Sequence, residues 1–125
     1  NHDRVKGKLR PYWKSIEQYA EINDENRLVI LSHYPIPFYK NQHYGAVMLY
    51  GHVHNTREWE LVEKWKKAQW ELGIPSRLIN VGCMMAYMNY TPRTLDELLE
   101  ANPQPMIKRI RKDGTNAGEN SNGEL

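Results

Sequence analysis

Two histidines one residue apart, His52 and His54, end an apolar run that begins at Ala46. In a β-strand, side chains two positions apart point to the same face, so we expect both imidazoles together at the end of one strand. Gly51 precedes them and has no side chain that would block a ligand. Neutral imidazole is a common metal ligand. The spacing therefore predicts a metal site, with ordinary hydrogen-bonded histidines as the alternative.

A second predicted strand also delivers a histidine. Residues 28–31 are a continuous apolar run, which is typical of a strand covered on both faces, and His33 follows at its carboxyl end. Prolines at positions 35 and 37 then favour a rigid loop. In an open α/β sheet the carboxyl ends of neighbouring strands lie at one edge, where ligand sites form. We therefore expect His33 to lie near His52 and His54.

The first three residues, Asn1, His2 and Asp3, add groups of compatible chemistry. Asn1 offers an amide oxygen, and His2 beside Asp3 offers a proton donor oriented by a carboxylate. The single cysteine, Cys83, excludes an internal disulfide and a cysteine zinc cluster, so any metal would be held by nitrogen and oxygen ligands. Cys83 itself is expected to be a small buried residue.

The remaining segments supply elements that could position these groups. Helices are predicted from Pro11 to about Tyr19, from Asn55 or Thr56 to about Leu72, and from Thr94, with a Glu97 capping box, to Asn102. Strands are predicted at residues 21–22, 27–32, 46–54 and 77–81, with a turn at residues 23–26. The expected buried stripe of the middle helix consists of Leu61, Val62, Trp65, Ala68 and Leu72. Its solvated face is expected to carry Lys64, Lys66 and Lys67 among four glutamates.

Composition bounds the class of protein. The chain has 125 residues, 40% hydrophobic and 26% charged, and a net charge of +2, which suits one globular domain and favours neither a membrane nor a nucleic-acid partner. No apolar stretch approaches the roughly 20 residues of a spanning helix, so we expect a cytoplasmic protein. Residues 113–125 are predicted to be a disordered tail, which leaves residues 1–112 for the domain. One basic cluster could contact nucleic acid, although solvation is the commoner role: Lys108, Arg109, Arg111 and Lys112.

Three motifs, in order, resemble the later motifs of the calcineurin-like metallophosphoesterases: N-H-D at residues 1–3, the strand and histidine at 28–33, and G-H-x-H at 51–54. I-N-V-G at residues 79–82 is similar to the strand and turn that follow G-H-x-H in that family. The resemblance implies an α/β fold, a four-layer sandwich of two mixed sheets flanked by helices. It also implies two divalent metals that share a bridging hydroxide. Manganese is favoured, and iron, zinc, cobalt and nickel also suit nitrogen and oxygen ligands.

The same resemblance implies a role for each matched residue. Asn1, His33 and His52 would hold one metal, and His54 would contribute to the other. His2 would protonate the leaving alkoxide or steady the phosphoryl oxygens, and Asp3 would orient it. The implied activity is hydrolysis of phosphomonoesters or phosphodiesters.

The earlier motifs of the family, Asp-x-His and a Gly-Asp pair, do not occur in the chain. The resemblance therefore covers the carboxyl-terminal part of such a domain, without its first strands. Besides a phosphoester substrate, the expected partners are the missing amino-terminal segment or a second chain, and self-association through exposed sheet. The chain alone is expected to bind at most one metal well and to hydrolyse esters poorly. The alternatives are a non-catalytic scaffold that binds metal or a partner, and purely structural histidines.

Overall fold

A computed structural model of the chain describes residues 7–107. Its elements, in chain order, are η1 (Gly7–Tyr12), β1 (Tyr19–Asp24), β2 (Arg27–Ser32), η2 (Gln42–Tyr44), β3 (Val47–Tyr50), α1 (Arg57–Glu71), β4 (Leu78–Asn80) and α2 (Leu95–Ala101), where η marks a 3₁₀ helix. Between residues 7 and 107, neither α-helix combines the length and apolar character needed to cross a bilayer. The predicted tail, the basic cluster and residues 1–3 lie outside the described part of the chain.

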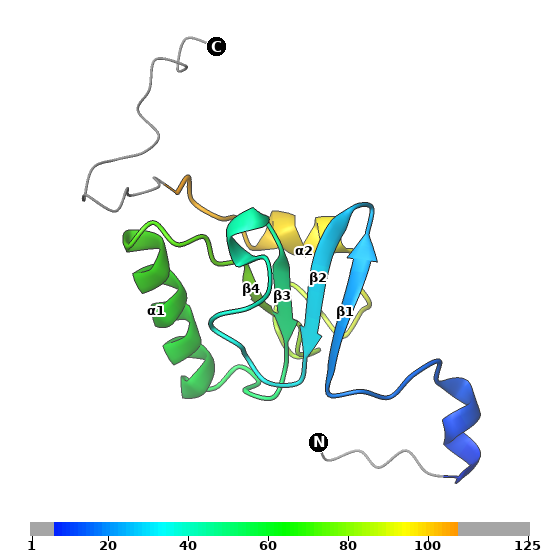
Figure 1. Ribbon diagram of the computed structural model, residues 1–125. Coiled ribbons are helices and arrows are strands. Elements are labelled where there is room, and N and C mark those ends of the chain that lie inside the picture. The colour runs from blue at the N-terminus through cyan, green and yellow to red at the C-terminus, as the bar shows by residue number, and fades with distance from the viewer. Residues whose placement is uncertain (1–6, 108–125) are drawn as a thin grey trace.

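The four strands form one mixed sheet in the order β1, β2, β3 and β4 (Figure 1). β1 is antiparallel to β2, whereas β2, β3 and β4 are parallel to one another. Ser32 pairs with Tyr50, and Tyr50 pairs with Asn80, so the three parallel strands end at the same level. This confirms the predicted α/β class and gives the sheet a carboxyl edge at which side chains from different segments can meet.

The β1–β2 hairpin is closed by the turn chemistry that the sequence predicts. Glu25 and Asn26 both have positive φ values, 49° and 66°, as the central residues of a tight two-residue hairpin turn require. The Asn26 amide also donates to Oδ1 of Asn23 at 2.9 Å. β2 has its predicted bounds, whereas β1 begins two residues earlier and ends two residues later than predicted, so the turn is shorter than residues 23–26.

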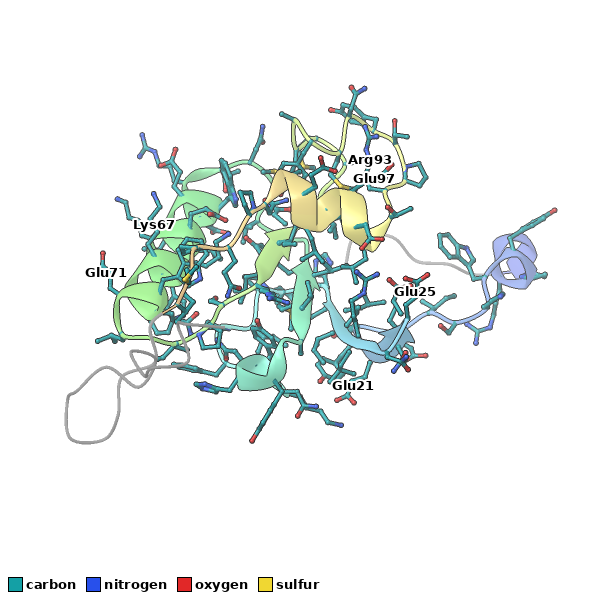
Figure 2. The ribbon with its side chains drawn as sticks, turned by 90° about the horizontal axis from the view of Figure 1, so that it is seen from above. Glu21, Glu25, Lys67, Glu71, Arg93 and Glu97 are labelled. Carbon is teal, nitrogen blue, oxygen red and sulfur yellow. The ribbon has the colours of Figure 1, made fainter. Side chains whose placement is uncertain are left out.

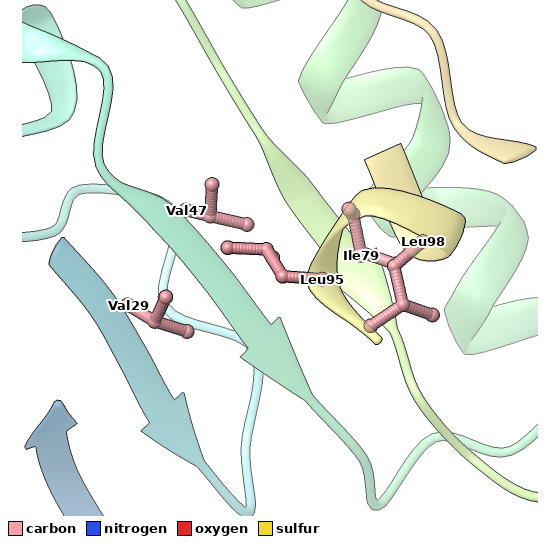
Figure 3. Packing of buried hydrophobic residues seen from close by; sticks show 5 residues of the cluster. All are labelled: Val29, Val47, Ile79, Leu95 and Leu98. Atoms are coloured by element: carbon pink, nitrogen blue, oxygen red, sulfur yellow. The ribbon is translucent and has the colours of Figure 1, made fainter. Parts of the chain in front are cut away.

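Both faces of the sheet contribute to a hydrophobic cluster, because alternate side chains along each strand enter different clusters. One face packs against α2, and its buried members are Val29, Val47, Ile79, Leu95 and Leu98 (Figure 3). The other face packs against α1, and its members include Ile30, Met48, Leu78, Trp59 and Val62. Because side chains on both faces are buried, the strand sequences are continuous apolar runs rather than alternating apolar and polar residues.

The helix predicted from Pro11 to Tyr19 does not form. A 3₁₀ helix ends at Tyr12 instead, and residues 13–18 have no regular structure. The apolar side chains that suggested an amphipathic stripe, Trp13 and Ile16 among them, are exposed. A helix this short is marginal without a surface on which to bury its stripe, so the periodicity alone was insufficient.

The predicted burial of α1 holds for Val62, which packs against the core, and is wrong for the rest of the stripe, including Ala68, which is exposed. Leu61, Trp65 and Leu72 are exposed, and the face turned to the sheet carries Trp59, Val62, Lys66 and Gln69. Lys66 is only 5% exposed, contrary to its predicted solvated position, whereas Lys64 and Lys67 are exposed as predicted. A long aliphatic stem lets lysine line a core when its ammonium finds partners. The stripe that packs on the sheet, with Lys66 and Gln69, is the more polar of the two, so apolar helical spacing favoured the other one.

The third predicted helix, α2, begins as expected. The Thr94 hydroxyl accepts from the Glu97 amide, and the Glu97 carboxylate accepts from the Thr94 amide, which completes the predicted capping box.

Before α2, the methionine-rich segment forms irregular turns that bury Met85. Cys83 in this segment is exposed, so its predicted burial is wrong. It lies directly after the Gly82 turn, where the chain leaves the sheet.

Side chains occupy the outer edge of β4. The Leu78 carbonyl accepts from Nζ of Lys66 at 3.1 Å, and the Asn80 carbonyl accepts from the Tyr87 hydroxyl. These are carbonyl groups with which an added strand would otherwise pair. Lys66 and Tyr87 therefore protect this edge against strand addition.

Buried tyrosines make the fold sensitive to alkali. Burial raises the pKa of Tyr39 from 10.0 to about 12, and burial likewise raises the pKa of Tyr50 and of Tyr87. The folded chain holds these protons more tightly than the unfolded chain. Their contribution to stability is therefore complete below about pH 10 and is lost as the pH rises through about 12. We expect the urea midpoint to be level up to about pH 10 and to fall above it.

Tyr50→Phe tests this origin of the alkaline sensitivity. The Tyr50 hydroxyl is buried and has no hydrogen-bond partner within residues 7–107. Its removal should leave stability at pH 7 unchanged or raise it by up to about 1 kcal/mol, and should make the alkaline fall shallower. Tyr39→Phe is the matched control, because that hydroxyl accepts from the Arg77 amide at 2.9 Å and its loss should cost about 1 kcal/mol. Equal losses at pH 7 would contradict this assignment.

Candidate metal centre

The backbone of His33 is fixed between two segments at the carboxyl edge of the sheet. Its amide donates to the Gln18 carbonyl at 3.1 Å, and its carbonyl accepts from the Gly51 amide at 3.1 Å. These two bonds continue the sheet pairing beyond the end of β2. They connect His33 to the segment before β1 on one side and to the residue after β3 on the other. The half-buried imidazole of His33 is thus anchored at the point where the loop containing His52 begins.

The structure brings His33 and His52 together. Nε2 of His33 lies 3.1 Å from Nδ1 of His52, with an angle of 67° between the rings. In one arrangement, one nitrogen donates its proton to the other. In another, both lone pairs face a common cation, for which two ligand nitrogens lie about 3.0–3.4 Å apart at ordinary metal–nitrogen distances. The observed separation therefore fits two ligands of one divalent metal.

Tyr34 packs against both imidazoles. Its ring centroid lies 4.9 Å from that of His33, nearly edge-on, and 4.5 Å from that of His52. Its contacts with both rings limit the orientations that the imidazoles can adopt. Tyr34 therefore helps to hold the two histidine side chains in place.

The backbone around His52 departs from the predicted strand. β3 ends at Tyr50, and His52 and His54 have φ values of 63° and 52°, in the left-handed region. The Val53 amide donates to the Gly51 carbonyl at 2.7 Å, which closes a γ-turn with His52 at its centre. A γ-turn with positive φ is rare and strained. The prediction that strand alternation puts both imidazoles on one face is therefore wrong.

Strain of this kind costs of order 1–3 kcal/mol per residue and persists only where the surroundings impose it. Asn80, at the end of β4 and 1% exposed, supplies one such constraint. Its Nδ2 donates to the His54 carbonyl at 2.7 Å, and its Oδ1 accepts from the Gly82 amide at 2.9 Å. The Thr56 hydroxyl adds a second constraint, because it donates to the Val53 carbonyl at 2.7 Å. Asn80 is not among the predicted site residues. A polar residue at the end of a buried strand is the sequence feature that could have identified it.

His54 does not join the histidine pair. Its side chain is exposed, and within residues 7–107 no three histidine, cysteine, aspartate or glutamate side chains are grouped so that they could hold a metal. The other predicted site residues, Asn1, His2 and Asp3, lie outside the described range. The described part of the chain thus brings together two imidazoles, those of His33 and His52.

A cavity of about 390 Å³ lies beside the pair, on the face of the sheet that α2 partly covers. Its lining includes Leu31 from β2, Leu49 from β3 and Val81, which directly follows β4, together with His33 and Gly51. The three apolar residues are only partly buried, although they pack against the buried cluster beneath α2. A hollow lined in part by apolar side chains therefore borders the two histidines.

Comparison of the chain with known protein families, curated proteins and solved structures finds no match.

Proposed function

We propose that this chain contributes part of the metal centre of a phosphoester hydrolase of the calcineurin-like metallophosphoesterase type. The observation that carries the proposal is the 3.1 Å approach of the His33 and His52 nitrogens. The two side chains come from the carboxyl ends of adjacent parallel strands, the edge at which open α/β sheets bind their ligands. The strained backbone at His52 adds support, because strain of this kind clusters at functional sites.

In this proposal His33 and His52 hold one metal together with the Asn1 amide, and His54 contributes to a second. His2, oriented by Asp3, donates a proton to the leaving alkoxide. Divalent metals would neutralise phosphate charge and make water acidic enough to attack near neutral pH. The ligands still required would come from a segment or chain beyond the described residues.

The finer architecture, a sandwich of two sheets, belongs to the same proposal. Leu31, Leu49 and Val81 line the open cavity beside His33 and remain partly exposed. An apolar sheet face of this kind is suited to packing against a second sheet about 10 Å away. Strands of that second sheet could carry the carboxylates that a dinuclear site requires.

A scaffold that binds metal or a partner without turnover is the alternative function. Two observations favour it. The side chain of His54 is exposed, and within residues 7–107 no more than two candidate ligands converge. Two imidazoles can hold a metal at modest affinity, but hydrolysis also needs the groups that activate water and stabilise the transition state. Metal binding without hydrolysis is the outcome that would select this alternative.

Metal content per chain tests the proposal. After equilibration with manganese and removal of the excess, we expect at most one bound ion per chain by elemental analysis. His33→Ala and His52→Ala should each lower the affinity at least about ten-fold, because each removes one of the two converging nitrogens. His43→Ala is the matched control, since this exposed histidine lies in η2, ahead of β3, at the opposite end of that strand.

Two outcomes decide between a metal centre and a structural histidine pair. If His33→Ala and His52→Ala bind manganese as tightly as the parent chain, the proposed centre is wrong. If they lose the ion while the control retains it, hydrolysis of phosphomonoesters and phosphodiesters should then be measured. We expect little turnover from the chain alone, and an increase when a segment that supplies carboxylates is added.

A further inference from the structure

The outer side of α1 carries large apolar side chains that the sheet does not cover. Leu61 and Leu72 are each 67% exposed, and Trp65 is 42% exposed. Phe38, from the loop after β2, is 64% exposed and packs edge-on against Trp65 with ring centroids 5.7 Å apart. Contiguous exposed apolar residues of this kind mark interaction surfaces. We call these four residues the outer apolar row.

The spacing along α1 gives the outer apolar row a specific geometry. Three residues of the row, together with the exposed Ala68, follow one another at intervals of four, three and four residues, as the seam of a coiled coil does: Leu61, Trp65, Ala68 and Leu72, the last directly after α1. At about 100° per residue, this seam is centred roughly 120° around the helix from the face that packs on the sheet. α1 therefore has an apolar seam that the sheet does not cover.

Charged residues border the seam on the side away from the sheet. Lys64 and Glu71 are exposed and form no ion pair within residues 7–107. Figure 2 shows Lys67 and Glu71 on the side of α1 that points away from the sheet. When two such helices pack antiparallel, residues at this flanking position of one helix face the same position of the other. Lys64 would then face Glu71, and the opposite charges would be matched twice by the two-fold symmetry.

We propose that the outer apolar row binds a second copy of this chain, with the two α1 helices antiparallel. Leu61 of one subunit meets Leu72 of the partner subunit, and Trp65 meets Ala68 of the partner subunit. Lys64 meets Glu71 of the partner subunit. A self-complementary patch is what a two-fold dimer requires, and the pairing is independent of the proposed metal centre. The small area of the row indicates a weak dimer.

A charge exchange tests the proposed pairing. Sedimentation of the full chain over a range of concentrations should reveal a monomer–dimer equilibrium. Lys64→Glu alone and Glu71→Lys alone each place like charges together, so each should weaken the dimer at least about ten-fold. The double variant restores opposite charges, so its dissociation constant should return to within about three-fold of the parent value. Circular dichroism should confirm that each variant remains folded.

The double variant distinguishes pairing between subunits from a change in the stability of α1. It loses the favourable spacings of Glu60 with Lys64 and of Lys67 with Glu71 inside each helix, so recovery of the dimer cannot reflect a more stable helix. Glu100→Lys, an exposed charge change on α2, is the control and should leave the dimer unchanged. The proposal is overturned by a monomer at all concentrations, as expected if another protein covers the row. It is also overturned by a dimer that both single reversals leave intact, or by a double variant as weak as the singles.

Discussion

Glu63→Ala is expected to lower the free energy of unfolding by about 3 kcal/mol, although Glu63 is partly exposed and lies on a surface helix. Its carboxylate lies 2.9 Å from Nζ of Lys66, whose side chain is almost completely buried between α1 and the sheet. Removal of the carboxylate leaves a buried ammonium with the Leu78 carbonyl as its remaining hydrogen-bond partner within residues 7–107. An uncompensated buried charge is among the most destabilising results of a single substitution. Urea unfolding at pH 7 measures the loss.

Lys66→Met should cost less than Glu63→Ala, and this asymmetry tests whether the buried ammonium causes the loss. Methionine keeps the aliphatic contact with the core, and the Glu63 side chain, 30% exposed, can turn toward water when its partner is lost. Glu60→Ala is the control, because Glu60 is exposed on the same helix, and its effect should stay within about 0.5 kcal/mol. A Glu63→Ala variant as stable as Glu60→Ala would show that the Lys66 ammonium has found water.

Lys66 also illustrates why part of the fold could not be predicted. Strands and turns were predictable wherever local chemistry determines them, as in the 27–32 strand and the Glu25–Asn26 turn. The orientation of α1 depends instead on which residues find partners on the sheet. The Leu78 carbonyl that accepts from Lys66 is twelve residues away in the sequence, and no spacing rule within the helix refers to it. Tertiary partners therefore decided the burial of a residue that local pattern assigned to water.

In the candidate metal centre, too, some features follow from the local sequence and others depend on tertiary contacts. That His33 lies near His52 follows from strands that end at one edge, and the sequence predicts both strands. The orientation of His52 and His54 was predicted from strand alternation, but β3 ends at Tyr50 and a γ-turn follows. Side chains from elsewhere contact the loop that follows, and among them Asn80 donates to the His54 carbonyl. Proximity was thus predictable from topology, whereas local backbone geometry depended on a contact from β4.

Asn80→Ala should therefore affect both stability and metal binding. The substitution removes the donor to the His54 carbonyl and the acceptor for the Gly82 amide, and leaves a small cavity at a buried site. We expect a loss of about 3 kcal/mol in the free energy of unfolding. Without this constraint the strained loop can relax, so His52 should spend less time beside His33. Manganese affinity should then fall about 10–100-fold, as it does when residues that orient metal ligands are changed.

Asn80→Asp separates the two effects. Aspartate has nearly the same volume and keeps an acceptor for the Gly82 amide, but its carboxylate would face the His54 carbonyl without a donor. We expect the loop, and with it manganese affinity, to be disturbed as much as in Asn80→Ala, despite the retained volume. Asn55→Ala, an exposed change in the adjacent segment, should alter neither quantity. If Asn80→Asp binds manganese like the parent chain, the bond to His54 does not position His52, and Asn80 serves packing alone.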